Sequence, residues 1–92
     1  MNSLPTLSPT EAPVTEKELC IWIRDLVAKL LKRQPEDIDI RLPFFDYGLE
    51  SMQAVSLASD LEAKLGRKIP EAVLWDHPTI LGLASHLVNG AR

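Results

Sequence analysis

The segment "FDYGLESMQAV", residues 45–55, marks the start of a helix near the middle of the 92-residue chain. Gly48 permits a backbone turn that would strain other residues. Ser51 then stands at the beginning of a run in which apolar residues recur at helical spacing. These apolar residues are Ala54, Leu57, Ala58, Leu61 and Leu65. We therefore predict a helix over residues 50–65, with Gly66 as the residue that ends it.

A longer helix is predicted upstream, over residues 15–33. Thr15 and Glu18 fit the capping box, in which a threonine and a glutamate three residues later satisfy free backbone N–H groups. The apolar residues behind this cap, which recur every three or four positions, are Leu19, Ile23, Leu26 and Leu30. Such spacing places them on one face of a helix.

Two further helices are predicted downstream. The proline that opens "PEAVLW", residues 70–75, suits the first turn of a short helix. A last helix is expected to begin near Pro78, with Asp76 or His77 as its cap and Asn89-Gly90 as its end. Its apolar face would comprise Ile80, Leu83, Ala84 and Leu87.

Residues 34–48 form a connection that is long for so small a domain. We expect Ile38, Leu42 and Phe44 to anchor it to the core. The chain contains no alternation of apolar and polar residues long enough to indicate a strand. The predicted fold class is therefore all-α, a small four-helix bundle of three long helices and one short helix.

The length of the chain allows one domain at most. Residues 1–14 are rich in proline, serine and threonine and are predicted to be a flexible linker or tail. Residues 89–92 are predicted to be a C-terminal tail.

The chain carries a net charge of −3, and its isoelectric point of about 5.3 disfavours nucleic-acid binding. Its apolar stretches are too interrupted for a membrane span. With no signal-like start and the single Cys20, we expect a cytoplasmic protein.

Ser51 can be read in two ways from the residues alone. Serine is a preferred helix cap, so Ser51 could serve only to satisfy a backbone N–H group. A helix N-terminus also tolerates a phosphate, because its unpaired N–H groups carry partial positive charge. A nucleophilic role is disfavoured, since the surrounding residues do not form a G-x-S-x-G elbow. The two histidines, His77 and His86, with one distant cysteine match no metal-ligand spacing.

Three separated features of the chain resemble one known family. Pro43-Phe44 precedes Gly48 at the family's spacing, and "GLESM", residues 48–52, is similar to the attachment motif G-x-D-S-L. "LWDHPTI", residues 74–80, is similar to the segment L-F-D-H-P-T-I. With these features in order, residues 15–88 resemble the acyl carrier protein domains of polyketide synthases and their fatty acid synthase relatives.

The resemblance implies a right-handed four-helix bundle whose second helix opens with a modified serine. Ser51 would carry a 4′-phosphopantetheine arm, transferred from coenzyme A by a phosphopantetheinyl transferase. The arm would hold acyl chains as thioesters, and the domain itself would catalyse nothing. Its partners would be a ketosynthase, an acyltransferase or acyl-adenylate ligase, and tailoring domains, with the isolated domain monomeric. The residues expected at the docking surface are Asp46, Leu49, Glu50, Met52, Val55 and Trp75.

Two alternatives stay open. The chain could be a helical interaction module without enzymatic activity, in which Ser51 is an ordinary cap. It could also be a peptidyl carrier of a nonribosomal synthetase, although those resemble G-G-x-S and Leu49 stands where their second glycine would be. A helix-turn-helix DNA reader is disfavoured by the acidic balance and by the long connection over residues 34–48.

Overall fold

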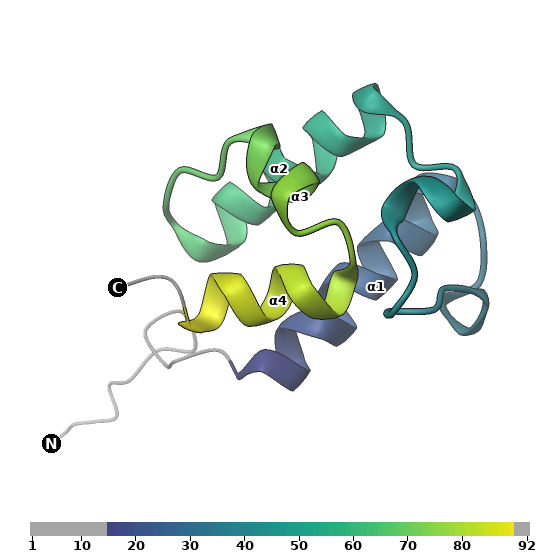
Figure 1. The fold of residues 1–92 in the computed structure, drawn as a ribbon, viewed down its shortest axis with the longest axis horizontal. Helices are drawn as coiled ribbons and strands as arrows, with labels where there is room; N and C mark the ends of the chain where they lie inside the picture. The colour runs from purple at the N-terminus through teal and green to yellow at the C-terminus, as the bar shows by residue number, and fades with distance from the viewer. Residues whose placement is uncertain (1–14, 90–92) are drawn as a thin grey trace, which may run out of the picture.

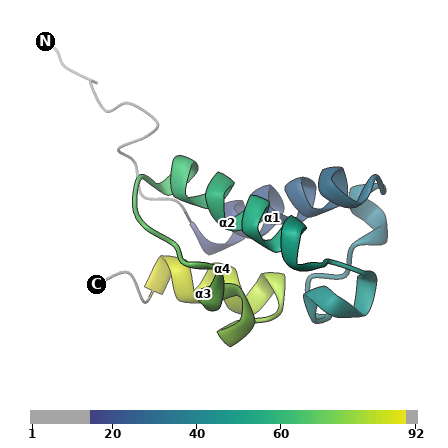
Figure 2. The same ribbon diagram turned by 90° about the horizontal axis from the view of Figure 1, so that it is seen from above.

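The computed structural model describes residues 15–89 as a bundle of four α-helices. The helices are α1 (Glu16–Leu31), α2 (Ser51–Leu65), α3 (Glu71–Asp76) and α4 (Ile80–Asn89), with two short 3₁₀ segments, η1 (Pro35–Asp37) and η2 (Phe44–Tyr47), in the long connection. The α4 helix packs against α1, and α3 packs against α2 (Figures 1 and 2). The predicted all-α class, with three long helices and one short helix, is confirmed. The predictions for residues 1–14 and 90–92 lie outside the described residues.

The ends of α1 follow from local backbone chemistry. The Glu18 N–H donates to Thr15 Oγ1 at 3.1 Å and the Thr15 N–H donates to Glu18 Oε1 at 3.2 Å, so the predicted capping box is confirmed. The helix ends at Leu31, two residues before the predicted end, because Lys32 adopts the left-handed conformation with φ 58°. The Arg33 N–H then donates to the Ala28 carbonyl at 2.8 Å and closes the end of the helix.

The long connection is anchored by apolar side chains, as predicted, but not by all of those expected. Ile38 and Phe44 are buried, whereas Leu42 is 42% exposed and does not anchor the connection. A turn closed by a hydrogen bond from the Leu42 N–H to the Asp39 carbonyl, at 3.1 Å, precedes this position. Tyr47 and Leu49 are buried instead.

The connection is also tied to the start of α4 through its backbone. The Phe44 N–H donates to the Pro78 carbonyl at 2.7 Å, and the Leu81 N–H donates to the Ile40 carbonyl at 3.0 Å. Between these bonds, Pro43 and Thr79 form an isolated β-bridge. The residues just before α2 are therefore fixed by a segment more than thirty positions downstream.

The cap of α4 differs from the prediction. Thr79 Oγ1 accepts a hydrogen bond from the Gly82 N–H at 2.9 Å, which is the pattern of an N-cap side chain. Asp76 and His77, the two expected caps, belong to the end of α3, where His77 is the C-cap residue. The helix starts later than expected because Pro78 and Thr79 are held in the backbone contacts with the connection.

The core is made of apolar residues from every helix and from the connection. In the described part of the chain, no polar or charged residue other than Tyr47 is buried. The fully buried large side chains are Leu19, Ile23, Val27, Phe44, Leu57, Leu61, Leu74, Ile80 and Leu83. A domain of this size has little interior, and these side chains fill it.

Candidate functional site

The start of α2 is set by a sharp turn directly after η2. Gly48 adopts a φ of 92°, a conformation that favours glycine, and its N–H donates to the Phe45 carbonyl at 3.3 Å. Glu50 is the N-cap residue: its carbonyl accepts from the Ala54 N–H at 2.8 Å, and its own N–H donates to Gln53 Oε1 at 2.7 Å. The N-cap position of α2 is therefore filled by Glu50 and not by Ser51.

Ser51 is the first residue of α2 and its side chain is exposed. Among residues 15–89, no hydrogen bond to or from the Ser51 hydroxyl is present. The reading of Ser51 as an ordinary cap is therefore wrong. The first N–H groups of an α-helix have no partner within the helix, so Ser51 presents a free hydroxyl at the positive end of α2.

Apolar side chains are exposed around Ser51. Met52 is 84% exposed, and Val55, one turn further along α2, is also exposed. Trp75 on α3 meets Phe45 on η2 edge-to-face, with ring centroids 6.2 Å apart, and both rings are exposed. Trp75 Nε1 also donates to Glu71 Oε2 at 3.1 Å, and Glu71 lines the same groove as Val55, which links α3 to the face of α2 that carries the predicted docking residues Met52 and Val55. Phe45 joins this set through its contact with Trp75.

We define the Ser51 face as the four exposed apolar residues Phe45, Met52, Val55 and Trp75 together with the exposed acids Asp46 and Glu50. Leu49 is not part of this surface, because its side chain is 3% exposed and packs in the core. Phe45 was missed because it follows Phe44 directly, so no periodic pattern separates the buried ring from the exposed one. The only signal was an aromatic residue adjacent to the attachment motif.

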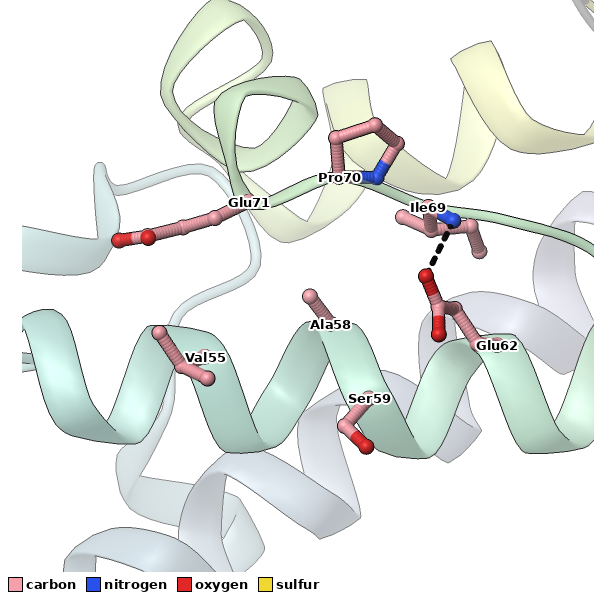
Figure 3. A pocket seen from close by; sticks show the side chains of 7 residues that line it. All are labelled: Val55, Ala58, Ser59, Glu62, Ile69, Pro70 and Glu71. Carbon is pink, nitrogen blue, oxygen red and sulfur yellow. Dashed lines mark hydrogen bonds between the residues drawn. The ribbon is translucent and has the colours of Figure 1, made fainter.

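A shallow groove of about 210 Å³ lies between α2 and the segment leading into α3 (Figure 3). It is lined by Val55, Ala58, Ser59, Glu62, Ile69, Pro70 and Glu71. The Ile69 N–H donates to Glu62 Oε2 at 2.8 Å and holds the two walls together at one end. The groove starts one helical turn from Ser51, at Val55.

The charges around the site are of one sign. Neither residues 42–63 nor residues 69–89 contain a lysine or arginine. Lys64 is therefore the only lysine or arginine on α2, α3 and α4. The other cations of the described chain lie on α1, in the long connection before α2 and directly after α2. The Ser51 face therefore combines exposed apolar groups with an acidic rim.

Tyr47, below the Ser51 face, is buried with a hydroxyl that has no hydrogen-bond partner in the described residues. Burial, with a smaller contribution from the nearby Asp39 carboxylate, raises the pKa of Tyr47 to about 12. Burial likewise raises the pKa of the Cys20 thiol, to which the charge of Glu16 also contributes. Both groups are therefore uncharged near neutral pH.

The remaining candidates for chemistry do not form a reactive cluster in the described chain. His77 and His86 stack on each other, with ring centroids 4.0 Å apart. Residues 15–89 contain no group of three or more histidine, cysteine, aspartate or glutamate side chains placed to hold a metal ion. No helix in this part of the chain is long and apolar enough to cross a membrane.

The four-helix bundle with an exposed serine hydroxyl at the start of its second helix fits the carrier domains that the sequence motifs resemble. The family model described as "Phosphopantetheine attachment site" matches residues 21–87. This chain belongs to the phosphopantetheine-attachment family, as its motifs suggested.

The comparisons with individual proteins agree on this class. The chain is 36% identical over 76 residues to a 6-methylsalicylic acid synthase of Penicillium patulum, covering 83% of this chain and 4% of the synthase. It is 43% identical over 70 residues to the nonribosomal peptide synthetase lenA of Aspergillus lentulus, covering 76% of this chain and 2% of the synthetase. A free-standing peptidyl carrier protein of Acinetobacter baumannii has a similar structure, with a TM-score of 0.80 and 39% identity, covering 84% of this chain and 96% of that one.

The residues at the start of α2 fit the family's prosthetic group, 4′-phosphopantetheine, which is attached covalently. A phosphodiester on Ser51 would lie at the positive end of α2, beside N–H groups that no carbonyl of the helix occupies. The hydroxyl is exposed and makes no hydrogen bond in the described chain that modification would have to break. The domain therefore acts as a carrier through this prosthetic group.

Proposed function

We propose that Ser51 is the residue that carries the 4′-phosphopantetheine group. Four serines lie within residues 21–87, and they differ in their backbone setting. Ser56 and Ser59 lie inside α2 and Ser85 lies inside α4, where backbone N–H groups are paired within the helix. Ser51 alone of the four opens a helix, and this position is the observation on which the proposal depends.

The proposed role is to hold acyl or polyketide intermediates and present them to partner enzymes. The terminal thiol of the bound group supplies the thioester chemistry. The chain's own residues supply an exposed attachment point, a rigid helix end and a docking surface. We propose that the domain catalyses nothing itself, in keeping with an interior filled by apolar side chains.

We propose that partners dock on the Ser51 face. Met52, Val55, Phe45 and Trp75 would bury apolar area, and Asp46 and Glu50 would pair with lysine or arginine on the partner. The proposed partners are a phosphopantetheinyl transferase, a ketosynthase, an acyltransferase or acyl-adenylate ligase, and tailoring domains. A monomeric isolated domain and a cytoplasmic setting remain predictions.

A peptidyl carrier role is the second candidate, and two similarities favour it. The chain is 43% identical to a segment of a nonribosomal peptide synthetase, and a peptidyl carrier protein has the similar fold described above. The motif with Leu49 in place of a second glycine favours the acyl carrier role. Parallel loading tests with acyl and aminoacyl adenylating enzymes would separate the two roles, because only the matching enzyme should charge the modified domain.

The attachment residue is tested by loading the purified chain from coenzyme A with a broad-specificity phosphopantetheinyl transferase. Ser51→Ala should abolish loading, while the matched control Ser56→Ala, an exposed serine on the same helix, should load like the unchanged protein. Loading of Ser51→Ala, or loss of loading in Ser56→Ala alone, would refute the assignment.

The docking surface is tested separately from the attachment residue. Met52→Glu replaces the most exposed apolar side chain of the Ser51 face and should lower kcat/KM for loading by about tenfold, roughly 1.4 kcal/mol of lost transition-state binding. Leu42→Glu, in the long connection, introduces the same change at an exposed apolar residue outside that face and should leave loading unchanged. Equal effects of both variants would count against a localised docking surface.

A further inference from the structure

A second hollow lies against α1, away from the residues of the Ser51 face. It measures about 300 Å³ and is lined by Lys17, Cys20, Ile21, Arg24 and Ile40. None of these residues belongs to the Ser51 face or lines the groove between α2 and α3. The carrier function described above therefore does not account for this hollow.

The hollow is built by one stripe of α1 and one residue of the long connection. Positions 17, 20, 21 and 24 follow the helical spacing of three, four and seven, so they share one face of α1. The connection supplies Ile40, whose carbonyl accepts a hydrogen bond from the Leu81 N–H at 3.0 Å. The hollow is thus held between two fixed segments and is part of the folded domain.

Its floor is apolar and its two ends are cationic. Cys20 is buried, whereas Ile21 is 43% exposed, which makes it one of the exposed large apolar side chains of the described chain. Lys17 and Arg24 stand seven residues apart along α1, a separation of about 10 Å along the helix axis. No acidic residue lines the hollow, although Glu16, Glu18 and Asp25 lie on neighbouring positions of the helix and the charge of Glu16 acts on Cys20.

Arg24 retains capacity for a further partner. Its Nη2 atom is 3.4 Å from Asp25 Oδ1, in a pair whose side chains are 35% and 53% exposed. An exposed pair of this kind contributes little to stability and exchanges easily with another carboxylate. The Arg24 Nε atom is buried without a hydrogen-bond acceptor in the described residues. That atom is covered by protein, so a ligand at this end would instead meet the outer N–H groups of the guanidinium, whose side chain is 35% exposed.

We propose that this α1 hollow is a second docking site, which binds an acidic amphipathic helix of a partner protein. The occupant would place apolar side chains over Ile21 and Ile40, and carboxylates about two helical turns apart would meet Lys17 and Arg24. Two cations at opposite ends favour a segment with two carboxylates over a fatty acid, which has one. Since this site shares no residue with the Ser51 face, a partner could hold the domain while Ser51 remains accessible.

The test records the amide NMR signals of the full chain, labelled with ¹⁵N, while a short helical peptide is added. The peptide has two leucines at its centre and one glutamate a helical turn away on each side of them. The peptide should shift the amide signals of residues 17–24 and 40, with an affinity in the range of roughly 10 μM to 1 mM. Added salt should weaken binding, because the rim charges are exposed. A peptide of the same composition with the leucines dispersed should not bind.

Matched variants separate the site from nonspecific attraction. The double variant Lys17→Glu, Arg24→Glu should weaken peptide binding at least about tenfold. The control variant Lys29→Glu, Lys68→Glu makes the same change in net charge at exposed lysines outside the hollow, and it should change the affinity less than about twofold. Ile21→Ala should weaken binding about tenfold, while Leu42→Ala, at the nearly equal exposure of 42%, should have no effect.

Four results of the ligand-binding experiments would overturn the proposal. They are the absence of binding up to about 1 mM peptide, binding that shifts other residues instead, equal losses in the test and control variants, and occupation of the hollow by decanoate but not by the peptide. Concentration-dependent dimerisation that shifts the same amides would assign the hollow to a second copy of the chain and would also overturn it. None of these outcomes depends on modification of Ser51.

Discussion

Tyr47 is buried in the described domain with a hydroxyl that has no partner, and its titration should be measurable directly. It is the only tyrosine of the chain, so absorbance of the tyrosinate ion reports on this residue alone. We expect a midpoint near pH 12, well above the ordinary value of about 10, because burial disfavours the charged form. A midpoint near pH 10 would mean that the hydroxyl is hydrated in the folded protein.

The same shift makes the domain less stable in alkaline solution. Between pH 10 and 12 the unfolded chain loses the tyrosine proton while the folded chain keeps it, so the free energy of unfolding falls as pH rises. The loss should approach about 2–3 kcal/mol by pH 12 and should be absent below about pH 9. Urea unfolding at several pH values measures it, with Tyr47→Phe as the control. That variant should remove this pH dependence without a large loss of stability, since the deleted hydroxyl has no partner.

Lys32 is the only residue other than glycine with a positive φ in the described chain, and this conformation is costly for a side chain with a Cβ atom. Lys32→Gly should therefore raise the free energy of unfolding by about 0.5–1 kcal/mol. Lys29→Gly, three residues earlier and inside α1, should lower it by about 1 kcal/mol. Denaturant unfolding of the two variants would show opposite signs. A destabilised Lys32→Gly variant would contradict the cap geometry.

The first residue of α4 is decided by a contact that no local pattern reveals. Thr79→Ala removes the side chain that accepts from the Gly82 N–H, so it should cost about 1 kcal/mol. Asp76→Ala changes an exposed residue at the end of α3 and should cost less than about 0.5 kcal/mol. A larger effect at Asp76 than at Thr79, measured by urea unfolding, would restore the cap that the sequence suggested.

The helices themselves could be predicted because each buries one apolar stripe, and the stripe repeats at the helical period. The ends at Thr15 and Gly66 could also be predicted, since a capping box and a glycine past the last turn act through neighbouring residues. The caps of α2 and α4 could not. Thr79 caps α4 in place of the expected Asp76 or His77, because a bridge to Pro43, a residue far away in the sequence, holds Thr79 at the start of the helix.

The candidate site divides in the same way. Ser51 and its exposed neighbour Met52 could be identified from the motif, because their setting depends on the turn at Gly48. The burial of Leu49 and the pairing of Phe45 with Trp75 could not, because both result from packing between segments distant in the chain. Leu42 was misjudged because an apolar residue in a connection can face either way, and a backbone turn precedes it here.

As a whole, the molecule separates its charges. Lysines and arginines are absent from residues 42–63, which include the start of α2, and most lie on α1 and near the far end of α2. A partner with a basic rim would therefore be guided to the Ser51 face, while the cationic α1 hollow faces partners of the opposite charge. The two proposed docking sites thus select different partners by charge as well as by position.

Ser51 itself should contribute little to stability. Because Glu50 is the N-cap residue and the Ser51 hydroxyl makes no hydrogen bond in the described chain, Ser51→Ala should change the free energy of unfolding by less than about 0.5 kcal/mol. A true cap would lose about 1 kcal/mol. Urea unfolding of the variant distinguishes the two and also shows that a failure to load is not a failure to fold.

The central claim is tested most directly by the intact mass of the purified chain before and after incubation with coenzyme A, magnesium and a phosphopantetheinyl transferase. No lysine or arginine lies between residues 42 and 63, so a tryptic peptide would contain Ser51, Ser56 and Ser59 together, and single-serine variants locate the site better than digestion. We predict a gain of one phosphopantetheine unit in the unchanged protein and in Ser56→Ala, and none in folded Ser51→Ala. No gain in the unchanged, folded protein, or a gain that survives Ser51→Ala, would contradict the account.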